Sequence, residues 1–176
     1  HTHIEYNLER FPRAQSMVRQ GVTTFVVGNC GFSPFPTTPA HRADLLATSA
    51  FLPGAPSWDW TDAETFLATL ERLPLAGNVA TLVGHGALRI AAMGLERRPP
   101  SGPELERMKL LLGESLRAGA FGLSSGLIYA PGNFATTDEL AELAGVVAEH
   151  GGVFAPPTPG GGGGPLGSPP GAGQAR

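Results

Sequence analysis

Residues 23–34 read TTFVVGNCGFSP and join an apolar run to a short polar turn. The run is β-branched or aromatic at every position, which is typical of a strand buried on both faces. The turn carries Cys30, the only cysteine of the chain, between Asn29 and Gly31. A strand that ends in such a turn places the thiol at the carboxyl edge of a sheet and not in its interior.

The same alternation of strand and helix extends over residues 1–155. Capping-box spacings, in which Ser or Thr is followed three residues later by Glu, mark the starts of the expected helices: Thr61 and Glu64, Ser101 and Glu104, Thr136 and Glu139. We expect strands near 21–28, 78–83, 119–124 and 151–155, and helices near 62–72, 102–118 and 137–149. We interpret HTHI at 1–4 as the remnant of one more strand. The alternation indicates parallel strands joined by right-handed βα units.

Composition and charge exclude several classes of protein. Hydrophobic residues make up 41% and charged residues 15% of the 176 residues, an ordinary globular balance. The net charge of −3 comes without a basic stripe, so we expect no nucleic-acid partner. No apolar run approaches the roughly 20 residues of a membrane span, so we expect no membrane partner and a cytoplasmic location. A single cysteine excludes an internal disulfide.

The last residues differ from the rest of the chain. Between Pro156 and Arg176, fourteen of twenty-one residues are Gly or Pro. Such a segment has too few large apolar side chains for their burial to offset the conformational entropy lost on ordering. We therefore expect two parts, a folded part at 1–155 and a disordered low-complexity tail at 156–176. One hypothesis for the tail is a reading-frame slip near Ala155, which the coding DNA would test.

Polar residues gather where the expected strands end, and in a (β/α)8 barrel that end carries the active site. His1 and His3 are two residues apart, so in an extended chain both imidazoles face one side and can reach one metal. Thiolate and imidazole together suit zinc, which makes Cys30 a further candidate ligand. Plainer interpretations stay open: a tag or chance for the two histidines, a small buried residue for Cys30, and a loop histidine for His85.

Four blocks of this sequence resemble one family of enzymes. HTHIE (1–5), VRQGVTTFVVGNCGFSP (18–34), LVGHGALRIAAMG (82–94) and GAFGLSSGLIYAPGNFATTDELAELAGVVAEHGG (119–152) are similar to the N-acyl-D-amino-acid deacylases of the amidohydrolase superfamily. The resemblance runs in order from His1 to about Ala155. It implies a zinc-dependent (β/α)8 TIM-type barrel, of which this chain is an incomplete part, about the first half. The implied substrate is a small-molecule N-acyl-D-amino acid, hydrolysed at its amide bond.

The resemblance also assigns roles to particular residues. It implies that His1, His3 and Cys30 are metal ligands for Zn2+. It implies that His85, Ile128 and Tyr129 bind substrate.

Some parts of the family pattern are not in this sequence. The general-base aspartate of the family is expected beyond the end of this chain, and the Thr-His-x-Arg segment of the family is replaced by the Gly/Pro tail. We therefore expect the chain alone to be inactive. Two alternatives remain: a cyclic-amide amidohydrolase of the dihydroorotase or hydantoinase kind, and a non-catalytic βα fragment.

Overall fold

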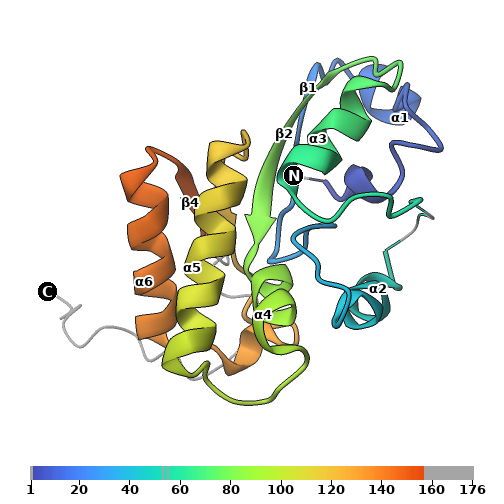
Figure 1. The fold of residues 1–176 in the computed structure, drawn as a ribbon. Coiled ribbons are helices and arrows are strands. Elements are labelled where there is room, and N and C mark those ends of the chain that lie inside the picture. Colours follow the sequence, from blue (N-terminus) through green and yellow to red (C-terminus); the bar gives the residue numbers. More distant parts are fainter. Residues whose placement is uncertain (1, 53, 55, 157–176) are drawn as a thin grey trace, which may run out of the picture.

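The computed structural model describes residues 2–52, 54 and 56–156. The strands in this part of the chain form one parallel sheet. Strands adjacent in the sheet are also consecutive in sequence, in the order β1 (Thr24–Val27), β2 (Asn78–Gly84), β3 (Gly122–Ser124) and β4 (Val153–Ala155). All three pairings are parallel, so every connection crosses over and carries helices (Figure 1). The expected parallel α/β sheet is therefore confirmed.

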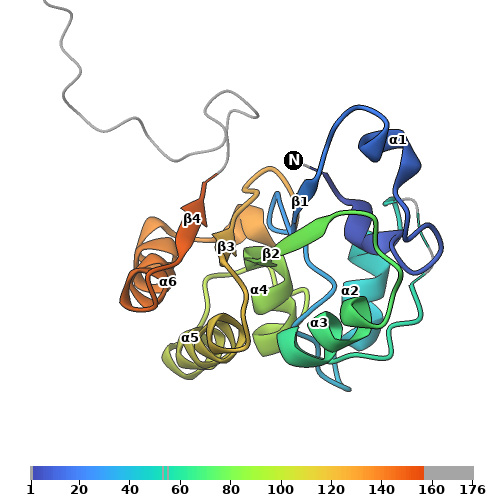
Figure 2. The ribbon, with the colours of Figure 1, turned by 90° about the horizontal axis from the view of Figure 1, so that it is seen from above.

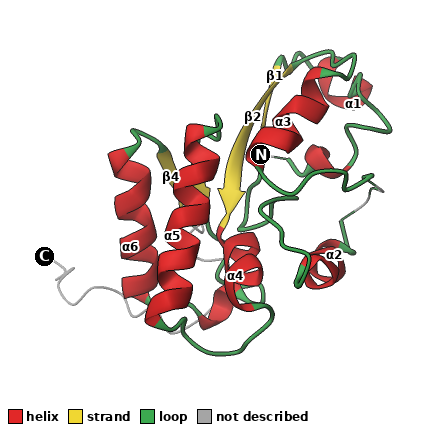
Figure 3. Ribbon diagram, in the orientation of Figure 1, coloured by secondary structure: helices red, strands yellow, loops and turns green. Residues whose placement is uncertain are grey.

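The helices occupy the crossovers and the N-terminal segment. Their bounds are η1 (Ile4–Tyr6), α1 (Gln15–Val18), α2 (Arg42–Ser49), α3 (Ala63–Glu71), α4 (His85–Met93), α5 (Gly102–Arg117), η2 (Gly132–Phe134) and α6 (Thr137–Glu149). The β1–β2 connection is the longest and consists largely of loop around α2 and α3 (Figure 3). Seen from above, α3, α4 and α5 lie along one face of the sheet (Figure 2).

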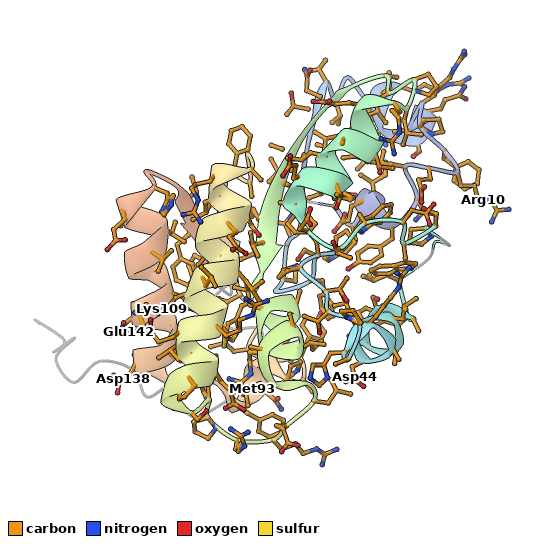
Figure 4. All side chains as sticks on the ribbon, in the orientation of Figure 1. Arg10, Asp44, Met93, Lys109, Asp138 and Glu142 are labelled. Carbon is orange, nitrogen blue, oxygen red and sulfur yellow. The ribbon has the colours of Figure 1, made fainter. Side chains whose placement is uncertain are left out.

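The two faces of the sheet have different surroundings. The helix-covered face contributes to a core whose fully buried side chains include Phe66, Leu88, Leu112, Leu123 and Leu143. The register places Val26 and Val153 together on the opposite face, where they are 44% and 59% exposed. In a closed barrel this face points inward, so its exposure fits a sheet that forms only part of a barrel. At the outer surface, Lys109 of α5 and Glu142 of α6 pair at 3.1 Å (Figure 4).

The described residues of HTHI, Thr2 to Ile4, are not in a strand, which corrects the expectation for this part of the segment. His1 lies outside the described residues, Thr2 and His3 are irregular, and Ile4–Tyr6 form η1. The reason lies in Glu5, whose Oε1 accepts a hydrogen bond from the backbone N–H of Gly28 at 3.1 Å. The carboxylate of Glu5 therefore accepts the hydrogen bond of the backbone N–H that follows β1, where a paired strand would offer a backbone carbonyl. The Gly/Pro tail at 157–176 also lies outside the described residues.

Other expected boundaries differ by a few residues for identifiable reasons. The third and fourth strands begin at Gly122 and Val153, later than expected, because Gly119 and Gly151 have positive φ and end the preceding helices. Helix α4 was not expected at all. It follows β2 directly, and its N-cap, Gly84, offers no side-chain cap as a sequence signal.

The cap of α3 also differs from the expected Thr61 and Glu64 pair. Asp62 is the N-cap, and its Oδ1 accepts a hydrogen bond from the backbone N–H of Thr65 at 2.8 Å. A carboxylate is favoured at this position because it also interacts with the positive end of the helix dipole.

Replacing the observed cap should therefore cost more than replacing the expected one. Asp62→Ala is expected to lower the free energy of unfolding by about 1 kcal/mol, the usual cost of losing an N-cap. Thr61→Ala is expected to cost less than half as much. Urea denaturation followed by tryptophan fluorescence measures both, and equal losses would contradict the assignment of the cap.

Candidate metal and substrate site

The turn after β1 has an unusual backbone. Gly28, Cys30 and Gly31 have φ of 75°, 57° and 78°, all in the left-handed region. For glycine this region is freely accessible, whereas for an ordinary L-residue it costs about 1–2 kcal/mol. Cys30 is therefore held in a backbone conformation that it does not favour, and other parts of the chain must hold it there.

Hydrogen bonds from the end of β3 and from the first turn of α4 hold this turn. The hydroxyl of Ser124, the last residue of β3, donates to the carbonyl of Gly28 at 2.5 Å and accepts from the N–H of Gly31 at 3.0 Å. The N–H of Gly86, in the first turn of α4, donates to the carbonyl of Gly31 at 3.0 Å. The turn of Cys30 is thus tied to both βα units that follow it in the sheet.

Close backbone packing above the turn explains two glycines. A Cβ at Gly126 would lie 1.9 Å from the carbonyl oxygen of Cys30, and a Cβ at Gly86 would lie 2.9 Å from that of Gly31. Real Cβ atoms do not approach backbone atoms so closely. The glycines after Ser125 and His85 therefore let the Cys30 turn pack directly against the loops that follow β2 and β3.

Glu5 connects the histidine segment to the Cys30 turn. Its side chain is fully buried, and its Oε1 lies 3.4 Å from Nδ1 of His3 while accepting the N–H of Gly28. A carboxylate behind one ring nitrogen is the arrangement typical of histidines that ligate a metal through the other nitrogen. One buried carboxylate therefore orients His3 and also contacts the residue at which the Cys30 turn begins.

The surroundings of Cys30 favour its protonated form. Burial in the first place, and the nearby charge of Glu5 in the second, raise the pKa of the Cys30 thiol above its ordinary value. The thiol is therefore protonated at neutral pH in this chain. A bound cation would reverse this preference, because a coordinating thiol is deprotonated by the metal.

The donors fit zinc in kind but do not complete a zinc site. Imidazole and thiolate are its preferred ligands, and zinc takes four ligands in tetrahedral geometry. Of the three expected ligands, His3 and Cys30 are described, whereas His1 lies outside the described residues. Within residues 2–52, 54 and 56–156, no group of three or more His, Cys, Asp or Glu side chains is arranged to hold a metal ion.

Ile128 and Tyr129, two of the expected substrate residues, lie at the surface in the loop after β3, and Tyr129 contacts the Cys30 turn. Their side chains are 60% and 41% exposed. The ring of Tyr129 contacts Phe32 at a centroid distance of 5.0 Å and stacks on Phe51 at 6.3 Å. Phe32 in turn meets the ring of His3 edge-on at 6.0 Å. We call Phe32, Phe51 and Tyr129 the aromatic cluster; it joins the turn, the end of α2 and the loop after β3.

His85, the third expected substrate residue, is not at this surface. Its side chain is fully buried at the start of α4, and Nε2 lies 2.8 Å from Oε1 of Glu139. Nη1 of Arg89 donates to both oxygens of the same carboxylate, at 2.7 and 2.6 Å. The structure therefore brings Tyr129 to the Cys30 turn, leaves Ile128 exposed in the same loop, and buries His85 at the start of α4.

No family model matches the chain. D-aminoacylase of Alcaligenes xylosoxydans xylosoxydans is 36% identical over 155 residues, covering 88% of this chain and 31% of that protein. N-acyl-D-aspartate deacylase of the same organism is 39% identical over 146 residues, covering 81% and 28%.

Solved structures agree with these sequence matches. A D-aminoacylase structure described as defining a novel subset of amidohydrolases superimposes with a TM-score of 0.74 at 35% identity, covering 88% of this chain and 32% of that one. N-acyl-D-glutamate deacylase from Bordetella bronchiseptica, complexed with zinc and a phosphonate inhibitor, gives 0.72 at 35% identity, covering 86% and 31%. The chain is a homologue of the N-acyl-D-amino-acid deacylases.

The homology confirms the expected resemblance and the partial barrel. The chain spans 28–31% of the length of the three curated deacylases that it matches. None of the helices in the described part of the chain is both long and apolar enough to cross a membrane. The roles of the individual site residues remain predictions.

Several residues of the deacylase homologue were not predicted to act at this site. Glu139 was interpreted only as a capping residue, and its N–H does bond to Thr136, but its carboxylate turns inward to His85 and Arg89. The four-residue spacing of His85 and Arg89 would have indicated a shared helix face if α4 had been expected. No sequence pattern indicates that Phe51 belongs to the site, because its ring contacts depend on how the β1–β2 connection folds.

The charge of Glu5 should be measurable at Cys30. Glu5→Gln keeps an oxygen that can accept the N–H of Gly28 but removes the negative charge, so the pKa of Cys30 should fall toward its ordinary value. The midpoint of the pH dependence of iodoacetamide alkylation reports this pKa. Glu9→Gln, which removes an exposed carboxylate that bonds Ser57, is the control. An unchanged or raised midpoint in Glu5→Gln would contradict the account.

The packing above the turn gives a second prediction. Gly126→Ala forces a methyl group against the carbonyl of Cys30 and is expected to destabilise the chain by about 1–3 kcal/mol, the usual cost of overpacking. Gly145→Ala in α6 has open space around it and is expected to be neutral or to stabilise by about 0.5–1 kcal/mol. Urea denaturation compares the two, and a harmless Gly126→Ala would refute the close approach.

Proposed function

We propose that this chain is part of a zinc-dependent hydrolase that cleaves N-acyl-D-amino acids into a D-amino acid and a carboxylate. The observation that carries the proposal is the pairing of His3 with the Cys30 turn through the buried carboxylate of Glu5. The homology to deacylases supports it, including one solved with zinc and a phosphonate that mimics the tetrahedral intermediate. The proposal concerns the whole enzyme, of which this chain supplies one portion.

In this proposal His1, His3 and Cys30 are the ligands that the chain contributes. Zinc, when bound, polarises an amide carbonyl and lowers the pKa of a water molecule so that it is nucleophilic near neutral pH. The residues of this chain prepare for that chemistry. Glu5 orients the ring of His3, and the hydrogen-bonded turn holds the sulfur of Cys30 in one place at the carboxyl edge of the sheet.

The general base must come from another carboxylate. Glu5 is buried behind His3 and Gly28, and Glu139 is bound by Arg89 and His85, so neither can reach a substrate. Hydrolysis needs a base within hydrogen-bond distance of the attacking water. We propose that this base belongs to the portion of the deacylases that lies outside the matched segment.

The mouth of the turn fits an apolar substrate group. The aromatic cluster presents apolar surface next to Cys30, and Ile128 is exposed in the same loop as Tyr129. A cleft of about 10 Å³, room for about one water molecule, reaches inward from there, so a substrate group would contact the rings at its mouth; its described lining includes Cys30, Phe32 and Tyr129 and contains no Lys or Arg. An acidic side chain would require a cation there. We therefore propose that N-acyl derivatives of apolar D-amino acids are the preferred substrates.

We also propose a cytoplasmic location. A thiolate ligand at Cys30 requires a reduced cysteine, and reducing compartments maintain that state.

A hybrid enzyme tests the function and the substrate preference. Residues 1–155 would replace the matched segment of a D-aminoacylase, and hydrolysis of N-acetyl-D-methionine would be measured with and without zinc. Zinc-dependent activity is expected from the hybrid, but none from the 176-residue chain alone. A correctly folded hybrid without activity, or zinc-dependent activity of the chain alone, would contradict the proposal.

Within that hybrid, Phe51→Ala and Tyr129→Ala remove rings of the aromatic cluster. Each is expected to raise KM for N-acetyl-D-methionine about tenfold, equivalent to about 1.4 kcal/mol of lost apolar contact. Phe11→Ala removes a ring whose exposure, 55%, lies between those of Phe51 and Tyr129 but which lies outside the aromatic cluster, and should leave KM unchanged. Equal effects of all three substitutions, or a preference for N-acetyl-D-glutamate, would argue against an apolar substrate site.

A further inference from the structure

Three polar side chains that take no part in the proposed chemistry meet in the interior between α4 and α6. His85, Arg89 and Glu139 are each fully buried, and Glu139 accepts hydrogen bonds from the other two. Arg89 also donates from Nη2 to the carbonyl of Arg98 at 2.6 Å. Such a group needs an explanation, because each charge lost its water on folding.

The charges within this group are balanced. Burial alone would raise the pKa of Glu139, but the hydrogen bonds and charges of His85 and Arg89 outweigh it and hold the pKa below its ordinary value. The carboxylate and the guanidinium then neutralise each other, and Nε2 of His85 donates to the same carboxylate. Buried ion pairs are often no more stabilising than apolar residues of similar volume. Stability is therefore a weak reason for this arrangement, and geometry is a better one.

The contact with Glu139 fixes which ring nitrogen of His85 carries the proton. Nε2 donates to the carboxylate, so in a neutral ring Nδ1 keeps its lone pair. Nδ1 is buried and has no hydrogen-bond partner among the described residues. Nδ1 faces Gly132, where a methyl group added to the glycine would lie 3.6 Å from Nδ1, at ordinary contact distance. The ring therefore lies next to Gly132, the residue at which the 126–132 loop ends.

The neighbouring residue contacts the other loop of the site. The N–H of Gly86 holds the carbonyl of Gly31 in the Cys30 turn at 3.0 Å. The dipeptide of His85 and Gly86 thus touches the Cys30 turn through its backbone and the 126–132 loop through its imidazole. That loop carries Tyr129.

From these contacts we infer that His85 is a positioning residue: Glu139 orients its imidazole, and the imidazole supports the 126–132 loop at a fixed height over the Cys30 turn. His85 would then act on substrate through Tyr129 and not by contact. The meaning of this for catalysis rests on the proposed function, but the support of the loop is a property of the chain itself. It can be measured without metal or substrate.

Hydrogen exchange of the 176-residue chain, followed by mass spectrometry, tests the inference. Four backbone N–H groups donate to carbonyls of the loop and can be monitored: Tyr129 to Gly126, Asn133 to Tyr129, Phe134 to Pro131 and Ala135 to Gly132. In His85→Asn the amide reaches only the position of Nδ1, so contact with Glu139 is lost and these amides should exchange at least tenfold faster. In His85→Gln the amide nitrogen occupies the position of Nε2, and exchange should stay within threefold of the parent chain.

The matched control is Glu142→Gln, which lies on the same helix as Glu139 but pairs with Lys109 at the surface. It should leave loop exchange unchanged, and peptides from α5 report global opening in every variant. Unchanged loop exchange in His85→Asn, or equal acceleration of the loop and α5, would overturn the inference.

A second measurement needs no variant. Nitrogen-15 NMR of the histidines in the parent chain should show His85 as the tautomer protonated at Nε2, with a slowly exchanging proton. A tautomer protonated at Nδ1, or a rapidly exchanging ring proton, would overturn the inference even if His85→Asn failed to fold. Neither readout depends on metal or substrate, so a failure of the proposed function would leave both unaffected.

Discussion

The site depends on one hydroxyl group, that of Ser124. By donating to the carbonyl of Gly28 and accepting from the N–H of Gly31, it closes the turn that holds Cys30. The turn places Cys30 in a left-handed conformation that an L-residue adopts only at a cost. Because Ser124 ends β3 while the turn follows β1, this bond exists only when the sheet has assembled across β2. The position of the only thiol therefore depends on the assembly of the sheet from β1 to β3.

Two buried carboxylates apply the same principle to two histidines. Glu5 lies behind Nδ1 of His3 and also bonds the backbone where the Cys30 turn begins. Glu139 lies behind Nε2 of His85 and is itself held by Arg89. In each case a carboxylate fixes the orientation of an imidazole, and a backbone N–H or a guanidinium fixes the carboxylate. The first pair faces the candidate metal site, and the second supports the loop above it.

The sequence was sufficient to predict the parts of the structure that depend on local pattern. Apolar runs gave the four strands, and the spacing of Ser or Thr to Glu found the starts of α5 and α6. Cys30 could be placed at the sheet edge because a polar turn follows a buried run. Local pattern failed where tertiary contacts decide. Ile4–Tyr6 form a 3-10 helix in which Glu5 binds the distant Gly28, and Glu139, whose spacing to Thr136 predicts only a cap, points its carboxylate into the core.

In this structure the hydrogen-bonded turn holds the Cys30 thiol in a fixed position, where it can ligate a metal ion. Titration of the 176-residue chain with cobalt(II), followed by absorption spectroscopy, tests this role of Cys30 most directly. Cys30 is the only cysteine, so a thiolate-to-cobalt charge-transfer band can arise only there. This band is expected to appear on titration and to be absent in Cys30→Ser. Cobalt binding without the band, or a band that survives in Cys30→Ser, would contradict this role.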